Sequence, residues 1–205
     1  PAQIVAITQT LDTDLDARSF RLGAFGFGSF RFEPPANVSY YTGRLDVRDS
    51  LGVFVDVNAG IDVTRGEVFW SLQSIDPAGG GAPANPLAGF LPVNDAIGRG
   101  QGFVSYTARP RPDSRTGDRI DARALIVFDD NPAIDTPEIF NTIDADAPRS
   151  RVDAFPAVID TTVFTVRWTG SDSTGSGDGR YTLFRSDDGG PLEVLRESVD
   201  GTSLA

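Results

Sequence analysis

The feature that most constrains this chain is the alternation of polar and apolar residues in short runs. Ser29 to Glu33 and Thr161 to Thr169 both alternate in this way, and Gly, Pro, Asn or Asp residues separate such runs at short intervals. A period of two residues is typical of β-strands with one wet face, and we find no convincing amphipathic helix. The sequence therefore predicts an all-β fold of antiparallel strands, a sandwich or a barrel, of which we expect the sandwich.

The runs that we expect to form strands extend over most of the chain. They are residues 3–9, 19–22, 29–33, 40–47, 52–57, 67–75, 102–107, 120–128, 161–169, 180–186 and 192–197, with a last short strand from Thr202. Asp187 to Gly190 is a strong hairpin signal between two of them. Gly23 to Gly28 lacks the features of a phosphate-binding loop, so we expect a bulged strand whose Gly residues allow close approach of another element.

Two segments between these runs organise the chain. Asp76 to Gly100 is rich in Pro, Gly and Asn, and we expect a long ordered loop that packs Phe90 and Leu91 back onto the sheet. Thr142 to Pro148 has the composition of a stiff link, because a residue that precedes Pro favours extended backbone. We therefore predict a β-sandwich domain at residues 1–146 and a partial immunoglobulin-like domain at residues 147–205.

The second segment resembles a fibronectin type III or related immunoglobulin-like module. The resemblance is carried by Phe164 to Trp168, by the loop that starts at Gly170 to Asp172, and by Tyr181 to Gly190. It covers only Pro148 to Ala205 and only the first strands of such a module. It implies a sandwich in which Trp168 lies on the buried-Trp strand.

The first segment is similar to an uncharacterised β-sandwich domain of giant secreted bacterial surface proteins, which precedes immunoglobulin-like repeats. The resemblance is carried by residues 7–12, 22–28, 89–92, 102–106 and 126–129. It implies a β-sandwich and an extracellular or cell-surface location, but no assigned activity.

Both ends of the chain look cut, and a cut sheet has an open edge, which natural proteins avoid or pair. There is no initiator Met, so we expect a mature or excised piece of a longer product. Two explanations stay open. The chain is a window on a longer protein, or a neighbouring copy supplies the missing strands, as in donor-strand filaments.

Composition excludes several classes of function. The net charge is −11, which repels phosphate backbones and anionic headgroups, so we expect no nucleic acid as a partner. No apolar run approaches membrane-spanning length, so we expect no membrane insertion. Cys and His are both absent, which removes thiol chemistry and the commonest general base. Abundant carboxylates without a framing motif do not indicate a glycosidase, and we expect no enzyme.

Calcium is the cofactor that the sequence predicts, because Ca²⁺ takes six to eight oxygen ligands and Asp is abundant here. The alternative for each Asp is turn capping or plain solvation. A strand end and its exit, the link between the domains and a Gly-rich loop supply the candidate ligands. They are Asp129, Asp130, Asn131, Asp135, Asp144, Asp146, Asp172 and Asp178.

Aromatic residues raise a second binding hypothesis. Tyr40, Tyr41, Trp70 and the Phe-rich strand near Phe25 form either a platform for stacking sugars or part of the core. Alternation favours the core for one of Phe69 and Trp70. The function that we expect is a non-catalytic, calcium-stabilised structural module of a secreted bacterial adhesin or extracellular filament, with other copies or flanking domains as partners. The alternative is a carbohydrate-binding accessory module of a secreted enzyme, with polysaccharide as the partner.

Overall fold

The computed structural model of this protein describes residues 1–172 and 179–205. The chain divides into two compact units. Unit 1 comprises Pro1–Asp113 and Ile120–Asn141, and unit 2 comprises Ser114–Arg119 and Thr142–Ala205. Across the described residues, no helix has the length and apolar character needed to cross a lipid bilayer.

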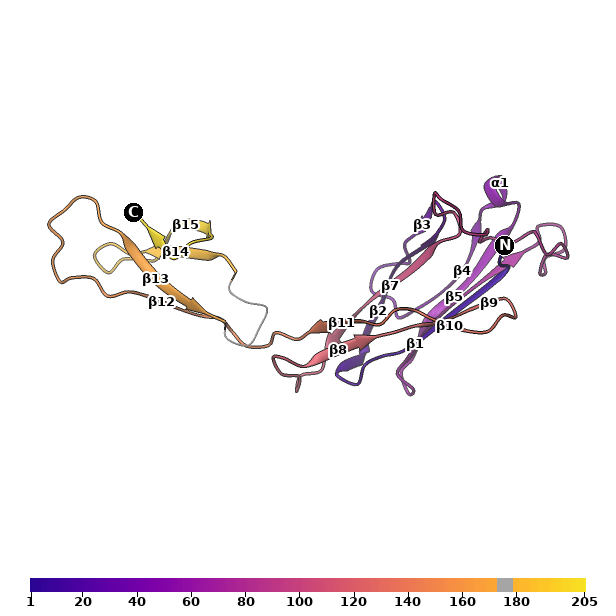
Figure 1. Cartoon of the computed structure of the whole chain (residues 1–205), viewed down its shortest axis with the longest axis horizontal. Coiled ribbons are helices and arrows are strands. Elements are labelled where there is room, and N and C mark those ends of the chain that lie inside the picture. Colours follow the sequence, from indigo (N-terminus) through magenta and orange to yellow (C-terminus); the bar gives the residue numbers. More distant parts are fainter. Residues whose placement is uncertain (173–178) are drawn as a thin grey trace. The chain divides into compact units, whose positions relative to one another are not determined.

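Unit 1 contains a six-stranded antiparallel sheet in the order β10-β9-β1-β6-β5-β4 and a three-stranded antiparallel sheet in the order β3-β2-β7 (Figure 1). The strands of the larger sheet are β10 (Ile134–Asp135), β9 (Leu125–Phe128), β1 (Ile4–Thr10), β6 (Glu67–Ile75), β5 (Phe54–Asp62) and β4 (Tyr40–Asp46). Those of the smaller sheet are β3 (Phe30–Phe32), β2 (Leu15–Phe27) and β7 (Gly102–Pro110). The only helix described is the single turn α1 (Arg48–Leu51), and β8 (Arg119–Ala122) pairs with β11 (Ile139–Thr142).

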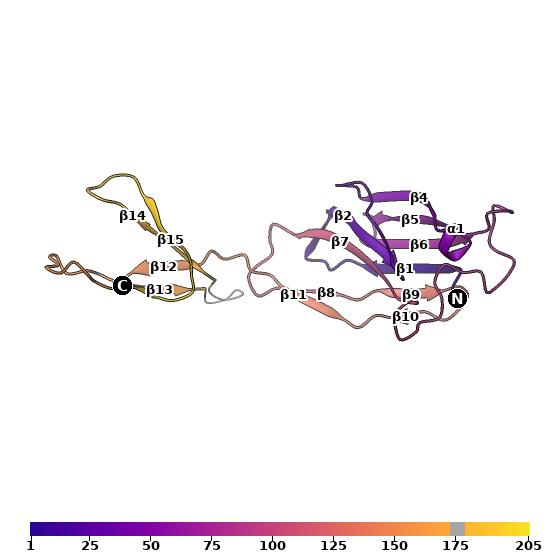
Figure 2. The ribbon, with the colours of Figure 1, turned by 90° about the horizontal axis from the view of Figure 1, so that it is seen from above.

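The core of unit 1 lies between these two sheets, and β2 and β7 run obliquely across the larger sheet (Figure 2). Inward-facing residues of β5 and β6 alternate with outward-facing ones, as the sequence predicts. Trp70 is 1% exposed and meets Phe20 of β2 edge to face, with ring centroids 6.3 Å apart. The predicted fold class, all-β with antiparallel sandwich-like packing, is therefore confirmed.

Unit 2 has two small sheets of its own, in the orders β12-β13-β16 and β14-β15. Their strands are β12 (Arg149–Val152), β13 (Val166–Ser171), β14 (Tyr181–Arg185), β15 (Glu193–Val199) and β16 (Ser203–Leu204). Trp168 is 3% exposed and packs edge to face on Tyr181, at 5.8 Å between centroids. Apolar side chains such as Val158, Val163 and Leu192 are exposed, so the core of this unit is thin.

Two predicted strands differ from the structure. Residues 120–128 form two strands, because β8 pairs with β11 while β9 pairs with β1, and residues 123 and 124 between them belong to neither strand. The predicted strand from Thr161 begins only at Val166, where Leu204 becomes its partner. Alternation marks residues suited to a strand, whereas the partner decides where the strand starts.

The loop from Asp76 to Gly100 is anchored as predicted. Phe90 and Leu91 are 2% and 8% exposed, and Leu91 exchanges backbone hydrogen bonds with Ala2. The hydroxyl of Ser74, fully buried, accepts a hydrogen bond from the N–H of Phe90 at 3.0 Å. Gly89 lies so close to the backbone of Ala2 that an added Cβ would clash with it. The loop therefore closes one end of the sandwich.

Candidate functional site: an open groove along strand β7

Strand β7 forms the outer edge of the smaller sheet, because it pairs with β2 and with no other strand among the described residues. The N–H of Gly28 donates to the carbonyl of Gln101 at 2.8 Å, and the N–H of Arg109 donates to the hydroxyl of Ser19 at 2.7 Å. Odd-numbered residues of β7 thus turn their backbone groups toward β2. By the alternation of an antiparallel strand, even-numbered residues turn theirs away from it.

The even-numbered positions therefore present a row of backbone N–H and C=O groups on the free edge. The register shifts between β2 and β7 arise from extra residues in β2, so β7 keeps its regular alternation. Within the described residues, no backbone hydrogen bond outside the sheets involves Gly102, Val104, Tyr106 or Ala108. Such an edge is a template for another strand.

A groove of about 740 Å³ runs along this edge. Residues 102–108 form one wall, and residues of β8, β9, β11 and the segments between them, Ile126 and Ile139 among them, form the other. Inward-facing Ile7 and Gln9 of β1 also line it. All of these residues belong to unit 1.

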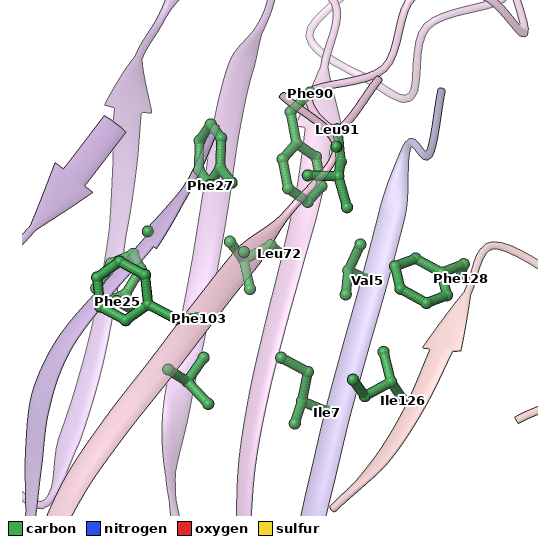
Figure 3. A pocket seen from close by; sticks show the side chains of 14 residues that line it. Val5, Ile7, Phe25, Phe27, Leu72, Phe90, Leu91, Phe103, Ile126 and Phe128 are labelled. Atoms are coloured by element: carbon green, nitrogen blue, oxygen red, sulfur yellow. The ribbon is translucent and has the colours of Figure 1, made fainter. Parts of the chain in front are cut away.

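The groove continues into an apolar cavity of about 80 Å³ between the two sheets. Ile7, Phe103, Val104 and Ile126 line both spaces. Figure 3 shows Val5 and Ile7 of β1 beside Phe128 and Ile126 of β9, with Phe90 and Leu91 across one end. The core of unit 1 is thus open to one side, along the strand edge that lacks a partner.

A hydrogen bond between the side chains of the two sheets lies inside the groove. The amide nitrogen of Gln9, which is 9% exposed, donates to the hydroxyl of Tyr106 at 2.8 Å. Burial raises the pKa of Tyr106, and the Gln9 hydrogen bond opposes this rise only in part. The phenol therefore stays protonated and keeps its own O–H available as a donor inside the groove.

The predicted calcium ligands at the end of β9 do not converge in the structure. One carboxylate oxygen of Asp129 accepts the N–H groups of Gln3 and Ile4, both at 2.8 Å. Asp135 lies opposite Leu125 in the β9–β10 pair, which places it about 13 Å along the strand from Asp129, and it pairs with Arg123 at 3.2 Å. The hairpin separates the two carboxylates.

The other predicted ligands come from three further places in the sequence: the residues after Asp129, the connection after β11 and the end of β13. Asp130 and Asn131 are exposed, and the amide of Asn131 donates to the carbonyl of Phe128 at 2.7 Å. Asp144 and Asp146 are exposed on the connection that follows β11, and Asp172 follows β13. Asp178 lies outside the described residues. In the described ranges, no group of three or more acidic side chains is placed to hold a metal ion.

The four aromatic residues considered for a sugar platform do not form one. Trp70 and Phe25 are core residues, at 1% and 2% exposure, and Tyr41 packs against that core. Tyr40 is 55% exposed on the opposite face of the sheet. Alternation predicted that one of Phe69 and Trp70 faces inward, and this is confirmed, with Trp70 inside.

Sequence reasoning missed the groove itself. Its walls come from β7 and from segments that follow it by ten residues or more, so only the pairing of the strands brings them together. In comparisons with known proteins, no family model, no curated protein and no solved structure matches this chain.

Proposed function

We propose that this chain is a non-catalytic structural module of a secreted bacterial adhesin or extracellular filament, and that neighbouring copies assemble by sharing a β-strand. The observation that supports this proposal is the free edge of β7 beside an open core. An extended strand entering the groove gains backbone hydrogen bonds from Gly102, Val104, Tyr106 and Ala108. Its alternate side chains enter the apolar cavity beside Val5 and Ile126.

Three further features fit this proposal. The resemblance of both segments to parts of secreted surface proteins implies the location and the tandem arrangement. The net charge of −11 keeps unassembled copies soluble through mutual repulsion. The acidic residues whose contacts are described above hold backbone groups or Arg side chains, as Asp129 and Asp135 do, and these are structural roles.

The first test is electron microscopy of the purified chain, together with light scattering over a range of protein concentrations. We expect ordered assemblies that grow with concentration. A monodisperse monomer whose groove stays open at all concentrations would contradict strand sharing between copies, and would leave the flanking parts of a longer chain as the source of the missing strand.

Ala108→Pro is expected to abolish assembly while leaving the melting temperature of unit 1 nearly unchanged. The N–H of Ala108 points to the free edge, so Pro removes a donor that no described residue uses, and its ring blocks the approach of a strand. Light scattering and thermal melting measure the two effects.

Thr107→Pro is the matched control, because the N–H of Thr107 points to β2. This variant is expected to lower the melting temperature of unit 1, since it breaks a hydrogen bond within the sheet. If Ala108→Pro assembles as well as the unsubstituted chain, the free edge of β7 is not the acceptor.

Calcium stabilisation, as the sequence predicts it, has its own measurement. A ligand that binds only the native state raises the melting temperature, by an amount that grows with its concentration. We expect millimolar Ca²⁺ to raise the melting temperature of the chain and excess chelator to lower it, with Mg²⁺ as the control ion. Identical melting curves in Ca²⁺ and in chelator would remove calcium from the proposal and leave strand sharing untouched.

A further inference from the structure

The outer face of the larger sheet in unit 1 carries a second groove, which is distinct from the one along β7. It has a volume of about 430 Å³ and is lined mainly by polar side chains of β4, β5 and β6. Two rows cross these strands. Thr42 lies opposite Asn58, which lies opposite Ser71, and Arg44 lies opposite Asp56, which lies opposite Gln73.

The hydrogen-bonding groups in this groove are free to bind a ligand. In the described structure, the side chains of Thr42, Asn58, Ser71 and Gln73 make no hydrogen bond to protein. Each amide offers two donors and one acceptor oxygen, and each hydroxyl both donates and accepts. Neighbouring rows and strands space these groups by about 5 to 7 Å, comparable with the length of one pyranose ring.

The groove contains one positive and one negative side chain, so its net charge is zero. Arg44 and Asp56 form a two-point ion pair, with N–O distances of 2.6 and 2.7 Å. Hydrogen bonding from Arg44 lowers the pKa of Asp56, so the pair keeps both charges in mildly acidic solution. The Arg44 guanidinium also lies over the ring of Phe54, at 5.5 Å from its centroid, which fixes its orientation.

An aromatic patch borders the polar rows. Tyr40 of β4 and Phe69 of β6 lie on either side of Gly60 in the sheet. A Cβ at Gly60 would lie 2.9 Å from the Tyr40 ring and 3.4 Å from the Phe69 ring, so both rings cover the space that Gly leaves. Tyr40 remains 55% exposed.

We propose that this groove binds a chain of an uncharged polysaccharide, with Tyr40 stacking against a sugar ring and Asn58 and Gln73 contacting its hydroxyl groups. A neutral groove on a chain of net charge −11 disfavours anionic polymers and matches an uncharged one. A flat aromatic beside unpaired amides suits the apolar faces and hydroxyl rims of sugars. This inference is independent of strand sharing, because the groove faces away from the core.

The test is native electrophoresis of the whole chain in gels that contain one soluble polysaccharide each. The neutral probes are mannan, dextran, xyloglucan, arabinoxylan, galactomannan and mixed-linkage β-glucan, and the anionic probes are polygalacturonate and hyaluronate. We expect at least one neutral polymer to retard the chain, and Tyr40→Ala, Asn58→Ala and Gln73→Ala each to weaken binding about fivefold to tenfold.

Phe184→Ala and Arg31→Ala are the matched controls, because they remove an exposed aromatic and an exposed Arg that line no part of this groove or of the groove along β7. Both are expected to bind like the unsubstituted chain, and thermal melting verifies that every variant is folded. The proposal is overturned if no neutral polymer retards the chain, if only the anionic polymers do, or if the three groove variants bind as the controls do.

Discussion

Trp70→Ala is expected to lower the free energy of unfolding of unit 1 by about 3 to 5 kcal/mol, which is the range for removing a buried Trp from a packed core. Trp70 is 1% exposed and contacts Phe20 and Tyr106 from the opposite sheet, at 6.3 and 6.2 Å between centroids. The substitution would leave an unfilled cavity between the two sheets at the centre of the sandwich.

The chain contains its own control for this measurement. Its two Trp residues lie in different units, so after the substitution the fluorescence of Trp168 reports on unit 2 alone. We expect circular dichroism in a urea titration to show an early transition of unit 1, while the Trp168 transition stays in place. A loss below about 1 kcal/mol would show that the two sheets do not pack through this residue.

Trp70→Phe is the conservative comparison, with an expected loss of about 1 to 2 kcal/mol, because the smaller ring leaves only a small cavity. The indole N–H of Trp70 is buried and has no hydrogen-bond partner, so Phe removes no bond. A large loss for Phe as well would show that the core does not close around the smaller ring.

Asp129→Ala is expected to cost unit 1 about 2 to 4 kcal/mol. Each of its two hydrogen bonds to a charged group contributes at most about 1.5 to 3 kcal/mol, and solvent reduces the sum because Asp129 is only partly buried. One oxygen of Asp129 accepts both N–H groups at the start of β1. The residue also has a φ of 50°, a left-handed conformation that Asp tolerates better than Ala. Urea titration followed by circular dichroism measures the loss.

Asp129→Asn separates these contributions. Asn keeps an acceptor oxygen and tolerates the same backbone conformation, so we expect it to lose less than half as much stability as Ala. The same experiment in excess chelator distinguishes the role of Asp129 as a backbone anchor from a role as a calcium ligand. If the difference between Ala and Asp disappears in chelator, Asp129 acts through a bound ion and the anchoring role is wrong.

The fold class was predictable because each strand of the core carries its own signal. The order Val68, Trp70, Leu72 puts every second residue of β6 inside, and this periodicity needs no knowledge of the partner strand. The burial of Phe90 was predictable for a related reason, since a large apolar side chain in a long loop has to be covered.

The candidate sites were less predictable, because each depends on register. The sequence places Asp129 and Asp135 six residues apart, yet the hairpin holds them at different levels of the strand pair. It gives no sign that Arg44 meets Asp56 or that Asn58 lies beside Thr42, because these pairs follow from one pairing of β4 with β5. A shift by one residue would exchange the two faces.

By itself, the sequence determined the class of this protein: short alternating strands, an apolar interior, an acidic surface and no His or Cys. These properties are local or additive, so they can be read without knowing which strands are neighbours. Only the tertiary structure decided that β7 has a free edge above an open core and that polar side chains of β4, β5 and β6 share one groove. Strand pairing joins residues that are distant in the chain, and this long-range register produces both sites.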